Sequence, residues 1–147
     1  MKLFHISDVL SVTTGRLVSS RHMDGIYEIL NFLTGDNLFT HQLPRAMNAC
    51  KPWLRSTFPT LMEDSPGMPE RLADMDRRIK AVQQDREHIA VAIRDWVEDL
   101  RLTLKLPDKL PVYELGSDMH THIDPIEEAR AMVGDDRVLV VSPDESL

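Results

Sequence analysis

Residues 70–105, ERLADMDRRIKAVQQDREHIAVAIRDWVEDLRLTLK, contain neither proline nor glycine. Apolar residues recur there at alternating spacings of three and four, a heptad register that predicts an amphipathic helix. The polar residues Gln83, Gln84 and Asp85 interrupt this register beside Arg86. The stretch is therefore either one helix of about 50 Å or an antiparallel pair of helices that turns near Asp85. Because no glycine or proline favours a turn there, we expect the continuous helix.

A continuous helix of that length would extend beyond the core of a domain this small, and its apolar seam would need a partner. A second copy of the chain is the simplest partner, so we expect a homodimer. The seam residues are Leu72, Met75, Ile79, Val82, Ile89, Ile93, Trp96 and Leu100.

The sequence before this stretch predicts a cluster of short elements over residues 1–61. A β-prone run at residues 2–6 precedes three amphipathic segments, which we expect to form helices over 8–14, over 22–34 and from Pro44 onward. Three prolines and a glycine between residues 59 and 69 then mark a joint. A second unit, residues 62–106, holds this linker and the long acidic helix.

Residues 107–147 predict a small βαβ-like unit with an acidic tail. We expect strands at 112–115 and 137–141, separated by a helix at 125–133. Together with the N-terminal strand they would form a three-stranded sheet with one covering helix, in one compact domain with residues 1–61. The expected fold class is therefore α+β: a short-helix cluster, a long central helix or helical hairpin, and this sheet.

Composition restricts the function to that of a globular protein. The chain is 42% apolar and 28% charged with a mean hydropathy of -0.26, and no run approaches the roughly 18 apolar residues of a membrane span. A single cysteine, Cys50, and the lack of a signal peptide predict a reducing cytoplasm and no membrane partner.

Charge is distributed unevenly along the chain. Residues 1–61 hold six basic and four acidic side chains, a net charge of +2, while the remaining eleven basic and twenty acidic side chains give -9. We therefore expect contacts with an anion to use the first part and contacts with a basic partner to use the rest.

The sequence offers few candidates for a catalytic or metal site. The run DMHTHID at residues 118–124 places His120, His122 and Asp124 on one side of an extended chain, where they would suit Zn²⁺ or Mn²⁺ in a metal-dependent hydrolase. Alternatively, Asp124 would cap the helix that begins at Pro125, and we prefer this second interpretation.

Cys50 lies on an apolar helix face, which favours a core position over a nucleophile. No phosphate-binding or serine-hydrolase motif occurs, so we expect no catalytic residue and no cofactor.

A nucleic-acid hypothesis depends on the third helix. Its polar face would carry Arg45, Asn48, Lys51 and Arg55, as on the recognition helix of a helix-turn-helix protein. The acidic remainder of the chain opposes this hypothesis, and a solvated polar face is preferred.

Two strings carry a family resemblance: ISDVLSVTTGRL at residues 6–17 and GDNLFTHQLPR at residues 35–45. They resemble a family of small phage- and prophage-encoded proteins of unknown function, which also tend to have a helix start like DPIEE at 124–128. The resemblance implies a phage origin and action in the cytoplasm of the bacterial host, with no assigned chemistry. Thr40, His41 and Gln42 join the polar face as candidate binding residues. The structural role expected of Thr40 or Gln42 is to satisfy backbone N–H groups at a helix start.

These observations favour a non-enzymatic phage accessory protein that binds a host protein, for example an inhibitor of a defence system such as an anti-CRISPR protein. The alternatives are the DNA-binding regulator and, second, the metal-dependent hydrolase.

Overall fold

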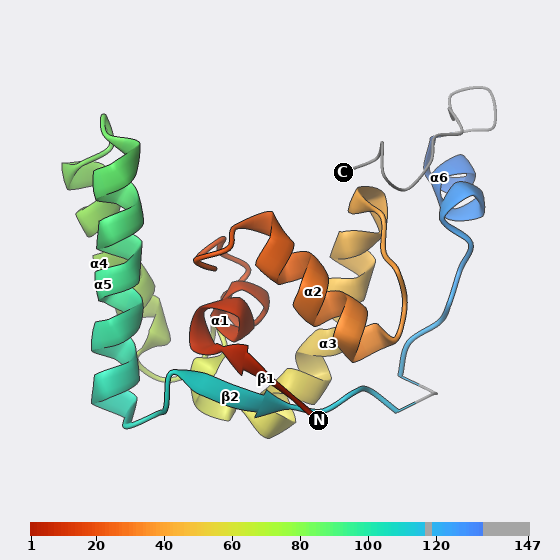
Figure 1. Ribbon diagram of the computed structural model, residues 1–147, viewed down its shortest axis with the longest axis horizontal. Helices are drawn as coiled ribbons and strands as arrows, with labels where there is room; N and C mark the ends of the chain where they lie inside the picture. Colours follow the sequence, from red (N-terminus) through yellow and green to blue (C-terminus); the bar gives the residue numbers. More distant parts are fainter. Residues whose placement is uncertain (117–118, 134–147) are drawn as a thin grey trace.

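The computed structural model describes residues 1–116 and 119–133 of the chain. Within that part lie six α-helices, two short 3-10 helices and two strands (Figure 1). In chain order they are β1 (Lys2–His5), α1 (Ile6–Thr14), α2 (Met23–Thr34), η1 (Thr40–Gln42), α3 (Leu43–Thr57), η2 (Pro59–Leu61), α4 (Met68–Ala81), α5 (Arg86–Leu104), β2 (Lys109–Val112) and α6 (Pro125–Val133). None of the described helices combines the length and apolar character needed to cross a bilayer.

Helix α1 is the centre of the fold, and all of its residues are buried. It packs against α2, α3, η2, both strands and α5. Its polar side chains are satisfied locally: Ser11 Oγ donates to the Ser7 carbonyl and accepts from the Val18 and Ser19 N–H groups. These hydrogen bonds allow a helix rich in serine and threonine to occupy the core.

A buried carboxylate joins α1 to α2. Asp8 is 1% exposed and accepts hydrogen bonds from Ser19 Oγ at 2.5 Å and from the Arg21 guanidinium at 2.7 Å. Helix α2 passes close to this group at Gly25, where a Cβ atom would lie 2.1 Å from Ser19 Oγ and 2.4 Å from Asp8 Oδ1. Glycine is therefore required by the close approach of the two helices.

The expectation of one continuous helix over residues 70–105 is wrong, and its alternative, a helical hairpin, is observed. Helices α4 and α5 are antiparallel and joined by a turn over 82–85 (Figure 1). Asp85 ends the turn and caps α5, since its Oδ1 accepts from the Glu87 N–H at 2.9 Å and the His88 N–H at 3.3 Å. A side-chain cap thus replaces the glycine or proline that the sequence lacks.

The predicted dimer seam is partly covered within the chain. Trp96 Nε1 donates to the Arg71 carbonyl at 2.7 Å, and Arg78 pairs with Asp99 across the hairpin. Leu72, Met75, Trp96 and Leu100 are buried, and Ile79, Val82, Ile89 and Ile93 are half-buried. The homodimer and its seam stay predictions, since four of the eight seam residues are buried within the hairpin and four are half-buried.

The expected α+β fold with a three-stranded sheet is also wrong: the described part is mostly helical and carries one two-stranded antiparallel sheet. The register pairs Lys2 with Val112 and His5 with Lys109. The second strand thus begins earlier than the expected 112–115, because Pro111 is tolerated in a strand at the edge of a sheet. The predicted strand at 137–141 lies outside the described residues.

Helix α6 has the predicted bounds but a different neighbour. It contacts η1 and lies beyond α3, away from the sheet that it was expected to cover (Figure 1). An extended segment after β2 runs past the end of α2, where the Leu115 N–H donates to the Leu33 carbonyl at 2.9 Å. Residues 119–133, here called the C-terminal arm, are thereby brought to the start of α3.

Candidate functional site

Three of the predicted binding residues hold the C-terminal arm. Gln42 is 1% exposed; its Oε1 accepts from the Phe39 N–H, and its Nε2 donates to the Ile123 carbonyl at 3.0 Å and to Glu128. His41 Nε2 donates to the Pro125 carbonyl at 2.7 Å. The expected structural role of Gln42, satisfying a backbone N–H at a helix start, is therefore confirmed.

Arg45 forms the strongest of these contacts. Its Nε and one terminal nitrogen donate to the two carboxylate oxygens of Glu128 at 3.0 and 2.8 Å, and the other donates to the Thr121 carbonyl at 2.8 Å. The hydrogen bond from Arg45 lowers the pKa of Glu128, a shift that burial opposes and a further hydrogen bond from Gln42 reinforces. This bidentate pair fixes α6 against the first turn of α3.

The remaining polar face of α3 is engaged with the loop that follows this helix. Lys51 pairs with Glu63 at 3.2 Å and Arg55 with Asp64 at 2.8 Å. Asn48 is exposed. Since Arg45, Lys51 and Arg55 all pair with carboxylates of the same chain, DNA phosphates would have to displace three internal partners.

Two histidines converge on one carboxylate at the base of the arm. His120 Nε2 and His122 Nδ1 each lie 2.9 Å from Asp36 Oδ2, and the two imidazole rings meet edge to face at 5.1 Å. Burial acts to raise the pKa of Asp36, and the hydrogen bonds from His120 and His122 outweigh it, so that the pKa is lowered. The carboxylate is therefore held in its charged form between the two rings.

Asp124 is not part of this cluster. Its Oδ1 accepts from the Ile126 N–H at 2.9 Å and the Glu127 N–H at 3.2 Å, the pattern of a helix N-cap. The preferred interpretation of the sequence is confirmed for this residue. The structure thus brings His120 and His122 together with Asp36 and not with Asp124.

Cys50 is a core residue. It is fully buried, and burial raises the pKa of its thiol to about 12. The thiolate needed for nucleophilic attack or metal binding is thus strongly disfavoured.

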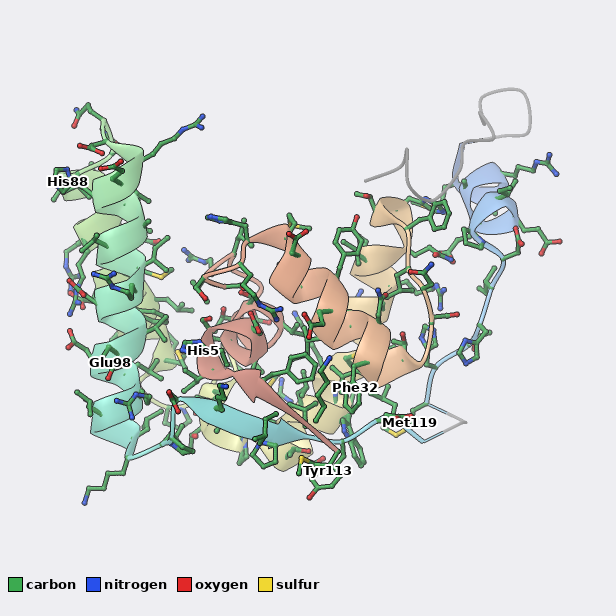
Figure 2. All side chains as sticks on the ribbon, viewed as in Figure 1. His5, Phe32, His88, Glu98, Tyr113 and Met119 are labelled. Carbon is green, nitrogen blue, oxygen red and sulfur yellow. The ribbon has the colours of Figure 1, made fainter. Side chains whose placement is uncertain are left out.

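A groove separates α5 from the loop between α1 and α2. Its volume is about 440 Å³, within the usual range for ligand pockets. The lining consists of His5, Ser7, Leu17, Val18, Ser19, Ser20, His22, Ala90, Val91, Ile93, Arg94, Val97 and Glu98. Figure 2 shows His5 beside α1 and Glu98 on α5, on the two sides of this groove.

His5 and Ser7 resemble a catalytic dyad only in their proximity. The Nδ1 atom of His5 lies 2.8 Å from Ser7 Oγ, but it also accepts the Ser7 N–H at 3.1 Å and so caps α1. Ser7 Oγ in turn accepts from the Ser20 N–H at 3.3 Å. These partners give both side chains a structural role at the helix start.

Sequence reasoning missed Asp36, Glu128 and the groove. Asp36 follows the Gly35 end of α2 and looks like an ordinary turn residue, while Glu128 looks like a favourable charge in the first turn of α6. No local pattern connects either residue with a partner more than 80 positions away.

Comparison with known families gives one match. Residues 4–64 are similar to the family described as "Domain of unknown function (DUF7736)". No curated protein and no solved structure matches the chain. The matched range runs from β1 to just beyond η2 and includes Asp36, Gln42 and Arg45, but neither His120 nor His122.

Proposed function

We propose that this protein is a non-enzymatic accessory protein that binds a host protein, and that it receives an apolar segment of that partner in the groove beside α5. The observation that carries the proposal is the groove itself, whose walls present Leu17 and Val91 to solvent at 46% and 39% exposure. Exposed aliphatic side chains that line a cavity are a feature of binding sites.

The groove has the composition of a protein interface. Its apolar lining comes from Leu17 and Val18 on one wall and from Val91 and Val97 on the other, among further residues. Positively and negatively charged side chains, together with uncharged polar ones, flank this lining. An apolar centre with a mixed polar rim suits a partner segment that buries a few aliphatic or aromatic side chains.

The backbone of the loop wall favours a helical partner over an added strand. The N–H groups of Val18, Ser19, Ser20, Arg21 and His22 all have acceptors within the chain. A strand that joined this wall would find these five donors already engaged. An amphipathic helix that inserts apolar side chains needs none of them.

The identity expected for the partner follows from the resemblance of residues 6–17 and 35–45 to phage proteins. We propose that the partner is a component of a bacterial defence system, such as a CRISPR effector. The ion pairs of Arg45, Lys51 and Arg55 support a protein partner over DNA, because these cations already have carboxylate partners.

The test is affinity capture from host lysate with matched surface variants. Val91→Asp places a charge in the groove, and Leu102→Asp places the same charge at a 59% exposed position of α5 outside it. We expect the wild type and Leu102→Asp to retain one stoichiometric host protein and Val91→Asp to lose it. Binding should then be reproduced with the purified partner.

Equal recovery by the two variants would place the interface elsewhere. Recovery of nuclease-sensitive DNA alone would instead favour the nucleic-acid alternative. Circular dichroism of both variants checks that the helical fold is retained.

A further inference from the structure

The cluster of Asp36, His120 and His122 has the geometry of a metal site. One ligand atom from each residue can be chosen so that all three lie within 4.8 Å of one another. Around a tetrahedral Zn²⁺ ion with N and O ligands at 2.0–2.2 Å, neighbouring ligand atoms are about 3.3 Å apart. The two observed separations of 2.9 Å to Asp36 therefore need to open by a few tenths of an ångström, and the two imidazole nitrogens, which lie within 4.8 Å of each other, need to reach the same spacing.

The chain holds both sides of this cluster in place through other contacts. Asp36 follows Gly35, which ends α2 with a φ of 71°, and the Asp36 N–H donates to Thr34 Oγ1 at 3.2 Å. Thr121, between the two histidines, is held through its carbonyl by Arg45. The three ligands are thus positioned by the fold before an ion arrives, which lowers the cost of binding it.

His120 is the most buried member of the cluster. Its residue exposure is 7%, and its Nδ1 atom has no hydrogen-bond partner among the described residues. Buried polar atoms are nearly always paired, and an exception calls for a bound water, an ion or a functional role. The nitrogen that faces Asp36 is Nε2, so an ion at the cluster would bind Nε2, and the case for the site is carried by the convergence of the three side chains.

The donor set selects the kind of ion. Two imidazoles and one carboxylate suit Zn²⁺ and similar first-row transition metals, whereas Mg²⁺ and Ca²⁺ prefer all-oxygen sites. His122 is 59% exposed at its side chain, so a fourth position faces solvent and would be filled by water.

We propose that Asp36, His120 and His122 bind one Zn²⁺ ion, which links the end of α2 to the C-terminal arm. The ion would bridge positions 84 and 86 residues apart in the sequence. This proposal is independent of the groove, because none of the three ligands lines it.

Zinc titration of the untagged full-length chain, freed of metal by a chelator, tests the proposal by calorimetry. We expect one Zn²⁺ per chain, with affinity reduced at least tenfold in Asp36→Asn and in His122→Ala. The matched control is His88→Ala: His88 forms an exposed pair with Asp85 at 2.8 Å, at the tip of the hairpin (Figure 2). This control should bind Zn²⁺ like the wild type, and Mg²⁺ should not compete.

Co²⁺ provides a readout that does not depend on stability. Visible absorption typical of tetrahedral Co²⁺ should appear in the wild type and in His88→Ala, and should be lost in His122→Ala. The proposal is overturned if the wild type binds no stoichiometric Zn²⁺, or if His122→Ala and Asp36→Asn bind as tightly as the wild type. Because His122 is largely exposed, its replacement should leave the fold intact, which thermal denaturation without metal will verify.

Discussion

Replacing Arg45 by methionine should release the C-terminal arm from α3. The guanidinium makes two charge-assisted hydrogen bonds to Glu128 and a third to the Thr121 carbonyl. Methionine has a similar length but no donor, so the Glu128 carboxylate, 11% exposed at its side chain, would keep only Gln42 as a hydrogen-bond partner in this cluster.

The expected loss follows from these contacts. Breaking a fully buried pair costs about 3–5 kcal/mol, and Arg45 is 31% exposed at its side chain, which reduces the estimate to about 2–3 kcal/mol. That free energy corresponds to a roughly 30- to 150-fold larger population of the detached arm. Helices α1 and α2 should be much less affected, because neither Arg45 nor Glu128 belongs to them.

Hydrogen exchange of the α6 amides measures this population directly. We expect exchange in α6 to accelerate by the stated factor, up to the limit set by the unprotected rate. The matched control is Arg55→Met, on the same helix, whose partner Asp64 is exposed and whose loss should change α6 protection little. Equal α6 protection in the two variants would refute the assignment of Arg45 as the main anchor of the arm.

Two further perturbations test the packing and charge arguments. Gly25→Ala should destabilise the chain by about 2 kcal/mol or more, because its Cβ would overlap Ser19 Oγ and Asp8 Oδ1; an unchanged urea midpoint would contradict this close approach. Acid should detach the arm, because the pKa of Glu128 is lowered on folding from its ordinary value of 4.5. The stabilising contribution of the Glu128 carboxylate is therefore complete above pH 4.5 and is lost as the pH falls through the folded-state pKa. Exchange of α6 amides should show this loss in the wild type, and Glu128→Gln should weaken the dependence, leaving the part that comes from Asp36.

The local elements of this fold were accessible from the sequence. The first helices end near Gly15 and Gly35, which both have a φ of 71°, and α6 begins after Asp124 as predicted. These signals act within one turn of a helix, so nearby residues suffice to identify them. The turn of the hairpin also had a local signal, the Asp85 cap, which the absence of glycine and proline obscured.

The candidate metal site could be predicted only in part. The spacing of two positions identifies His120 and His122 as a pair, whereas the sequence points to the neighbouring Asp124 as their carboxylate and not to Asp36. Asp124 was also a strong helix cap, and its backbone contacts exclude it from the cluster.

The sequence by itself therefore determined the positions of most helices, the burial of Cys50 and the capping role of Asp124. Only the tertiary structure decided that residues 70–105 fold back as a hairpin, that Arg45 holds Glu128, and that Asp36 meets two histidines. The physical reason is separation along the chain: caps and turns depend on near neighbours, whereas these contacts join residues brought together by the packing of distant elements.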